Sequence, residues 1–150
     1  MEGLNSQVLF LGWRRDMAQM YSASDIVVLT SLNEGTPVVL IEAMASARPF
    51  VATNVGGVQD LMVGKGQEIM GRNGGRFTRY ENGILIASQD VEGLTGALLY
   101  LMEHPHASLE MGRVGKEFAA KHFTKERLIE DIQSLYEELI RTKKVELSWA

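Results

Sequence analysis

Short apolar runs recur along the chain and alternate with stretches in which apolar residues follow a helical period. Four runs have the length and continuous hydrophobicity of strands: Gln7–Leu11, Asp25–Leu29, Phe50–Thr53 and Ile84–Ala87. Strands of this kind are typical of a parallel sheet that helices cover on both faces. The pattern therefore predicts an α/β fold with a Rossmann-like open parallel sheet.

The segments between and after these runs carry apolar residues three or four positions apart, as amphipathic helices do. Helices are expected at 16–21, Pro37–Ala47, 58–63, 91–103, Ser108–Lys121 and from Thr124 to about Lys143. In the second of these helices, one side is expected to carry Val38, Ile41, Met44 and Ala45. Strands that alternate with helices in this order indicate a single domain built from β-α units.

The alternation breaks in the segment 64–83, which holds six glycines and three arginines. This segment is predicted to be a long surface loop, and connections longer than about 12 to 15 residues are uncommon unless they are functional or mobile. Two interpretations stay open. The arginines could face an anionic partner such as a phosphate or a membrane surface, or the segment could be a flexible insertion.

Length and composition are those of an ordinary globular domain. The chain has 150 residues, of which 45% are hydrophobic and 23% charged, and this balance disfavours disorder. A net charge of −4 argues against nucleic acid as a partner, and the absence of cysteine excludes disulfides and thiolate metal sites. Without a signal peptide or a long apolar run, the expected location is cytoplasmic.

The segment from Glu34 to Glu42 carries the clearest chemical signal, because it places two carboxylates eight positions apart across a loop that becomes a helix. Pro37 suits the first helical position, and Thr36 is expected to be the N-cap. The free N–H groups and the positive end of the helix dipole would then attract a phosphate beyond the preceding strand. One carboxylate before the helix start and one behind it suit a ligand that carries both phosphate and hydroxyl groups.

Four segments in order carry a resemblance to a known family: Phe10–Trp13, Tyr21–Asp25, the Glu-x7-Glu block from Glu34 to Glu42, and Val55–Gly57 followed by Asp60. Together they resemble the donor-binding half of retaining GT-B glycosyltransferases of family 4, also called group 1. The likeness extends from about Val8 to the last helix. It implies the C-terminal half of a GT-B fold, with the acceptor domain and a first donor-domain strand absent from this chain.

The resemblance also implies roles for individual residues. The backbone N–H groups of Val38 and Val39 would hold a diphosphate, within a donor-binding loop formed with Gly35, Thr36 and Pro37. Glu34 is the catalytic candidate and would bind donor-sugar hydroxyls, whereas Glu42 would bind the ribose diol. Arg14 matches a position near the nucleobase, although it could equally be an exposed arginine beside Arg15.

The function expected from the resemblance is transfer of a sugar from a nucleotide diphosphate to an acceptor, with retention of configuration and without a metal ion or other cofactor. The expected partners are the nucleotide sugar, an N-terminal acceptor domain, and a membrane-associated acceptor that would make the whole protein peripheral to a membrane.

Two other classes stay open. Paired carboxylates also serve glycoside hydrolases, although these require two facing carboxyl groups about 5 to 10 Å apart over the scissile bond. A nucleotide-sugar-binding or assembly domain without transferase activity would bind the donor and transfer nothing.

Overall fold

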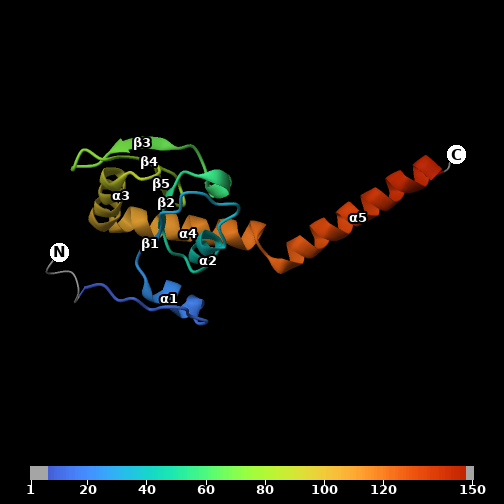
Figure 1. Ribbon diagram of the computed structural model, residues 1–150, viewed down its shortest axis with the longest axis horizontal. Helices are drawn as coiled ribbons and strands as arrows, with labels where there is room; N and C mark the ends of the chain where they lie inside the picture. The colour runs from blue at the N-terminus through green and yellow to red at the C-terminus, as the bar shows by residue number, and fades with distance from the viewer. Residues whose placement is uncertain (1–6, 148–150) are drawn as a thin grey trace.

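The centre of the protein is a five-stranded sheet (Figure 1). The computed structural model describes residues 7–147. The strand order is β1 (Val27–Leu29), β2 (Phe50–Thr53), β5 (Ile84–Ile86), β4 (Arg76–Arg79) and β3 (Gln67–Met70). The first three are parallel, and the last two continue the sheet antiparallel. The predicted α/β class with an open, mainly parallel sheet is confirmed.

Helices cover both faces of the parallel strands and bury two apolar clusters. On one face, α2 (Val38–Ala45) and the 3-10 helix η1 (Gly56–Leu61) pack against β2 and β5 through Leu40, Met44 and Leu61. On the other face, α3 (Val91–Glu103) packs through Ala97 and Leu101. Successive strand residues point to opposite faces, so β2 contributes Phe50 and Ala52 to the first cluster and Val51 to the second.

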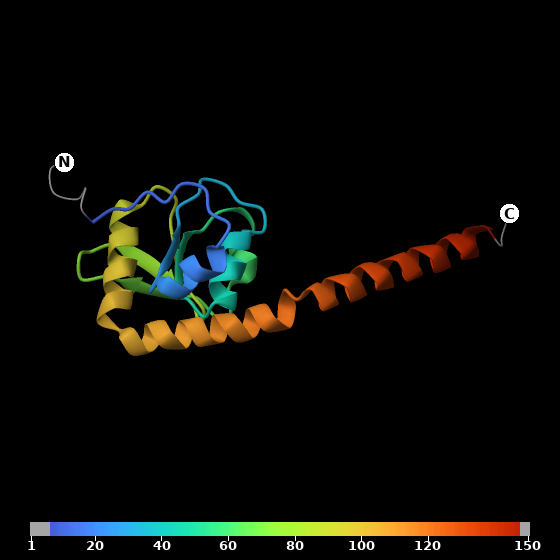
Figure 2. The ribbon, with the colours of Figure 1, turned by 90° about the horizontal axis from the view of Figure 1, so that it is seen from below.

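Two further helices complete the body. α4 (Pro105–His122) runs across the body from α3 to α2 and contributes to both clusters, through Ala119 and Met111 (Figure 2). It begins three residues before the predicted start, because Pro105 fits the first turn of a helix, where its missing N–H is not needed. α1 (Met17–Ala23) is short and lies beside α2, which its buried Tyr21 contacts.

The predicted strand Gln7–Leu11 is wrong. Residues 7–11 form no strand in the structure, and their side chains are exposed, with Phe10 92% accessible. A strand needs a neighbour that pairs with its N–H and C=O groups. Among the described residues the sheet ends at β1, and none of its strands pairs with this segment.

The segment 64–83, predicted to be a long surface loop, instead contains the β3–β4 hairpin. Its two strands do alternate, with Ile69 and Phe77 directed to the α3 face and Glu68, Met70 and Arg76 exposed. A glycine-rich turn joins them, in which the Gly71 N–H donates to the Gly75 carbonyl at 2.8 Å. The prediction failed because the many charged and glycine residues hid a period-two pattern that directs only one apolar residue of each strand to the core.

α5 (Lys125–Leu147) extends away from the body as a single long helix (Figures 1 and 2). It matches the predicted last helix, but the side chains of its apolar stripe are exposed, Leu128, Leu135 and Tyr136 by 55 to 62%. Among the described helices, none combines the length and hydrophobicity needed to cross a bilayer.

Candidate functional site

The candidate site lies where β1 and β2 end, because parallel neighbours present their carboxyl ends at the same edge of a sheet. The loop 30–37 follows β1 and leads into α2, and the turn Asn54–Gly57 follows β2. The Thr53 hydroxyl joins the two by donating to the Ser31 carbonyl at 2.6 Å. The loop that carries the predicted site is therefore attached to the buried part of the sheet.

Glu34 is held from both its side chain and its backbone. The Ser31 hydroxyl donates to Glu34 Oε1 at 2.6 Å, and the Gly57 N–H donates to the Glu34 carbonyl at 3.2 Å. Within the described residues no donor reaches Oε2, so this half-buried carboxylate keeps one oxygen for a ligand hydroxyl.

Gly56 makes this arrangement possible. Its φ is +51°, and a Cβ at this position would lie 1.8 Å from the Glu34 carbonyl oxygen. Only glycine permits both the left-handed backbone and the close approach of the two loops. The turn that contains Gly56 therefore supports the Glu34 loop directly.

The start of α2 differs from the prediction in one respect. Thr36 is not the N-cap; Pro37 occupies that position with extended backbone angles, and no side chain caps the helix. The Pro37 carbonyl accepts from the N–H groups of Leu40 and Ile41 at 3.1 and 3.4 Å. The N–H groups of Val38 and Val39 have no acceptor among the described residues, so the helix start presents two unoccupied donors.

Of the four residues predicted to share one side of α2, Met44 is buried and Ile41 is partly buried, whereas Val38 and Ala45 are exposed. The helix buries Leu40, Ala43 and Met44, whereas Val38 is 61% exposed. The first turn of α2 is thus exposed at Val38 and Val39 and open to a ligand.

Glu42 is exposed on α2 and already has one protein partner. The Tyr21 hydroxyl, from α1, donates to Glu42 Oε2 at 2.9 Å. Burial of the ring, and then the hydrogen bond and the charge of Glu42, raise the pKa of Tyr21 to about 12. The Glu42 side chain therefore faces solvent and Tyr21, although its neighbours in sequence are apolar.

Arg14 lies in the segment before α1 and pairs with Asp16, to which its Nε donates at 2.8 Å. This hydrogen bond and the charge of Asp16 raise the pKa of Arg14, and the guanidinium in turn lowers the pKa of Asp16. The neighbouring Arg15 lies 4.9 Å from the ring centre of Trp13. Within the described residues no hydrogen bond or ion pair joins Arg14 to Glu34 or Glu42.

The structure thus brings together Glu34, Gly35, Thr36, Pro37, Val38, Val39 and Glu42 along one loop and helix, and Arg14 comes from a separate segment. Sequence reasoning missed the supporting side chains Ser31, Thr53 and Tyr21. Ser31, three positions before Glu34 in a polar loop, offered a weak local signal for a hydrogen bond. Nothing local could link Thr53 or Tyr21 to the site, because both act across more than 20 positions of sequence.

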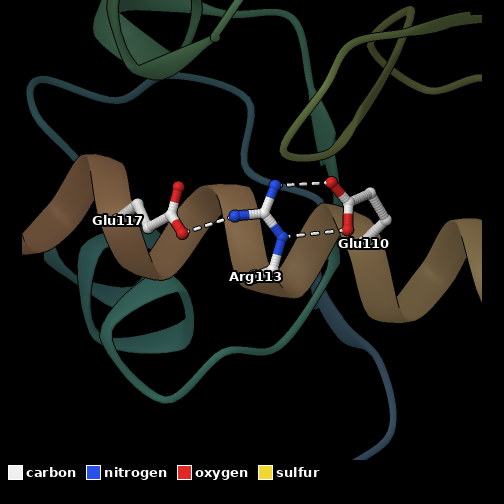
Figure 3. Close-up of polar contacts among 3 residues, drawn as sticks. All are labelled: Glu110, Arg113 and Glu117. Carbon is white, nitrogen blue, oxygen red and sulfur yellow. Dashed lines mark hydrogen bonds and ion pairs between the residues drawn. The ribbon is translucent and has the colours of Figure 1, made fainter.

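A second charged cluster lies on α4 and has the features of a surface ion-pair network. Arg113 donates to both oxygens of Glu110, at 2.9 and 2.6 Å, and pairs with Glu117 one turn further on (Figure 3). These contacts raise the pKa of Arg113 and lower that of Glu110. All three side chains are more than half exposed and come from one helix, so they stabilise α4 slightly and form no site. In the part of the chain that the structure describes, no three acidic or histidine side chains gather as metal ligands would.

Comparison with known proteins gives consistent results. Residues 1–104 match the protein family described as “Glycosyl transferases group 1”. N-acetyl-alpha-D-glucosaminyl L-malate synthase of Bacillus anthracis is 26% identical over 141 residues, which are 94% of this chain and 33% of that protein. A trehalose synthase of Rubrobacter xylanophilus is 32% identical over 119 residues, 79% of this chain and 24% of that protein.

Solved structures show the same arrangement of elements. Sucrose-phosphate synthase of Thermosynechococcus elongatus superposes with a TM-score of 0.77 at 28% identity, over 93% of this chain and 32% of that one. HepE of Anabaena, solved in complex with UDP and glucose, superposes with a TM-score of 0.76 at 26% identity, over 90% of this chain and 33% of HepE. This chain therefore spans about a third of the length of these relatives.

Proposed function

Because the chain belongs to the glycosyl transferases group 1 family, we propose that it binds a nucleotide-diphosphate sugar as the donor part of a retaining glycosyltransferase. Two structures of the related HepE contain UDP together with glucose, or UDP-glucose, which supports a nucleotide sugar as the ligand. Since the chain spans about a third of its relatives, the acceptor would be bound by polypeptide beyond these 150 residues.

The observation that carries the proposal is the start of α2. The unoccupied N–H groups of Val38 and Val39 lie at the positive end of the helix dipole, at the carboxyl edge of a parallel sheet. A diphosphate bound there gains negative charge as the sugar leaves it. Fixed N–H donors would stabilise that charge without a metal ion, which is electrostatic catalysis of leaving-group departure.

The two glutamates would hold the two ends of the donor. Glu34, fixed by Ser31 and Gly57, has a free Oε2 that can accept from a hydroxyl of the transferred sugar. Glu42 lies one turn into α2, where its carboxylate can accept from the ribose diol while Tyr21 holds it in place. Arg14 would lie near the nucleobase, where a guanidinium can stack on a flat ring.

A titration of the 150-residue chain with UDP, GDP and ADP, followed by amide NMR, tests the location of the site. We expect the amide signals of Gly35, Thr36, Val38 and Val39 to shift with at least one of these ligands. Shifts confined to the β3–β4 hairpin would contradict the proposal.

We also expect the chain alone to transfer no sugar, because the acceptor part is not in it, and measured turnover would show that the site is complete.

Substitution of the two glutamates tests their separate roles. Glu42→Ala should lower the affinity for UDP and for UDP-glucose alike, by about tenfold, because both ligands carry the ribose. Glu34→Ala should leave the affinity for UDP unchanged and lower only the affinity for UDP-glucose, because free UDP carries no transferred sugar for Glu34 to contact. Glu130→Ala, an exposed glutamate on α5, is the matched control. Equal loss of UDP affinity in both site variants would rule out this division.

Sugar transfer must also be distinguished from glycoside hydrolysis and from binding without transfer. This experiment uses a longer form of the protein that includes the acceptor-binding part. A glycoside hydrolase would release free sugar from an oligosaccharide that lacks nucleotide. A binding or assembly domain would bind UDP-glucose and produce neither free sugar nor a glycosylated acceptor. Product analysis with and without acceptor distinguishes the three.

A further inference from the structure

The β3–β4 hairpin extends the sheet beyond the helices on one face, so this face of the hairpin itself is uncovered. On the opposite face, Phe77 is 3% exposed and packs with Ala97 and Leu101 of α3. On the uncovered face of the hairpin, Glu68 lies opposite Thr78 and Met70 lies opposite Arg76. Thr78 pairs in turn with Leu85 of β5, which is buried in the cluster under α2 and η1. Glu68, Met70 and Arg76 are exposed, so this side of the hairpin has polar and apolar groups that no helix covers.

This face borders a cavity of about 610 Å³. Its other walls come from the carboxyl ends of β2 and β5 and the start of α3, through Asn54, Ala87 and Asp90. The volume is in the range of sites that hold small ligands. Asn54 directly precedes the Val55–Gly57 turn that supports Glu34, so the cavity and the candidate donor site lie at adjacent strand ends of one sheet edge.

The polar side chains around the cavity include anionic, cationic and neutral groups, and most of them have no hydrogen-bond partner among the described residues. They comprise two carboxylates (Glu68 and Asp90), one guanidinium (Arg76), one amide (Asn54) and one hydroxyl (Thr78). Asp90 accepts one hydrogen bond, from the Gly93 N–H at 2.8 Å. The side chains of the other four make no hydrogen bond or ion pair with any described residue.

This combination suits a neutral ligand with many hydroxyl groups. Each hydroxyl can donate a hydrogen bond to a carboxylate and accept one from a guanidinium or an amide, so the site can satisfy both the donor and the acceptor of a hydroxyl group. Met70 and Ala87 are exposed and offer apolar contact for the C–H face of a sugar ring. A phosphate group would meet two carboxylates and only one cation. Phe77 is among the residues that line the cavity, but its ring packs against Tyr100 on the other face and is 3% exposed, so it offers a nucleobase little surface for stacking.

We propose that the cavity formed by the β3–β4 hairpin, Asn54 and Asp90 is a carbohydrate-binding subsite, separate from the nucleotide site at the start of α2. It binds the sugar ring through hydroxyl contacts to Glu68, Arg76 and Asn54. Occupation of this subsite needs no nucleotide, so the inference goes beyond the donor site and stands or falls independently of it.

The test is an amide NMR titration of the 150-residue chain with methyl α-glucoside, methyl α-mannoside, methyl α-galactoside, maltose and sucrose, none of which carries a charge. We expect at least one of them to cause saturable shifts at residues 68–70, 76–78 and 85–90. Glu68→Gln and Arg76→Gln should each raise the dissociation constant by about tenfold. Both side chains are exposed, so neither variant is expected to unfold.

Glu130→Gln is the matched control, because it makes the same chemical change on α5, far along the chain from the cavity, and it should leave the dissociation constant unchanged. The subsite is ruled out if none of the five sugars shifts these amides saturably, or if both cavity variants bind as the parent chain does. It is also ruled out if UDP shifts these amides in place of those at 35–39, since the cavity would then be the nucleotide site. UDP shifts at 35–39 without any sugar effect at the hairpin would leave the proposed function standing and remove this subsite alone.

Discussion

At the residue scale, the contact between Tyr21 and Glu42 connects two segments of the candidate site. Tyr21 is 5% exposed, and its hydroxyl donates to a carboxylate that faces solvent. The ring therefore supports α1 against α2, and the hydroxyl orients Glu42. Removing the hydroxyl should affect stability, its dependence on pH and the position of the carboxylate.

We predict that Tyr21→Phe lowers the free energy of unfolding by about 1 kcal/mol at neutral pH, because one hydrogen bond is lost. The folded pKa of Tyr21 is about 12, above its ordinary value of 10.0, so the folded state holds this proton more tightly. The resulting stability is complete below pH 10 and is lost as the pH rises toward 12. Denaturant unfolding across this range should show a steeper decline for the parent chain than for Tyr21→Phe. The exposed Tyr136→Phe is the control and should match the parent.

Gly56 is the residue whose replacement should most directly disturb Glu34. Gly56→Ala would place a Cβ 1.8 Å from the Glu34 carbonyl oxygen and force an alanine to φ +51°. We predict a loss of stability of roughly 2 kcal/mol or more, together with weaker UDP-glucose binding. Gly74→Ala is the control, since Gly74 also has a positive φ, +84°, but has open space around its Cβ position. If both variants lose the same stability and both keep UDP-glucose affinity, the close approach of the two loops has no role in the site.

At the element scale, the β3–β4 hairpin is joined to α3 by close backbone contact. The Asn73 side-chain amide donates to the Glu92 carbonyl at 2.9 Å, and a Cβ at Gly75 would lie 2.0 Å from the same oxygen. The hairpin is therefore a fixed wall of the cavity.

We predict that Gly75→Ala separates the hairpin turn from α3 and increases the hydrogen-exchange rates of the β3 and β4 amides by about tenfold or more. Exchange in β1 and β2 should be unchanged, because these strands do not contact the turn. Gly74→Ala, one residue earlier, strains a positive φ but has nothing near its Cβ position, so it should raise these exchange rates less than Gly75→Ala does. Equal exchange rates in Gly75→Ala and the parent would show that the contact is not needed.

At the scale of the whole molecule, the body from α1 to α4 is built around the two apolar clusters, and α5 belongs to neither of them. The side chains of α5 are exposed at residues 125–143, where the structure describes them. We predict that a chain ending at Thr124 keeps the thermal midpoint of the parent within about 4 °C. Circular dichroism would follow both the midpoint and the helix signal, which should fall with the loss of α5. A much lower midpoint would show that α5 stabilises the body, whereas Leu101→Ala, in the buried core, should lower the midpoint clearly.

The sequence by itself determined the class of fold, the order of its helices and three of the strands. Continuous apolar runs and helical periods are local properties, and they identify buried strands and amphipathic helices without knowledge of their partners. The loop before α2 was found in the same way, because proline and the flanking glutamates occur within nine consecutive residues.

The tertiary structure alone decided what depends on partners distant in sequence. Residues 7–11 have a strand pattern and form no strand, because no neighbour pairs with them, whereas 67–70 and 76–79 lack an obvious strand pattern and become strands because β5 offers a free edge. The support of Glu34 by Gly57, the contact of Glu42 with Tyr21 and the cavity beside the hairpin arise in the same way, from segments about 20 or more positions apart. Local propensity cannot predict such contacts, because pairing of hydrogen-bonding groups and packing of side chains are satisfied only in the assembled fold.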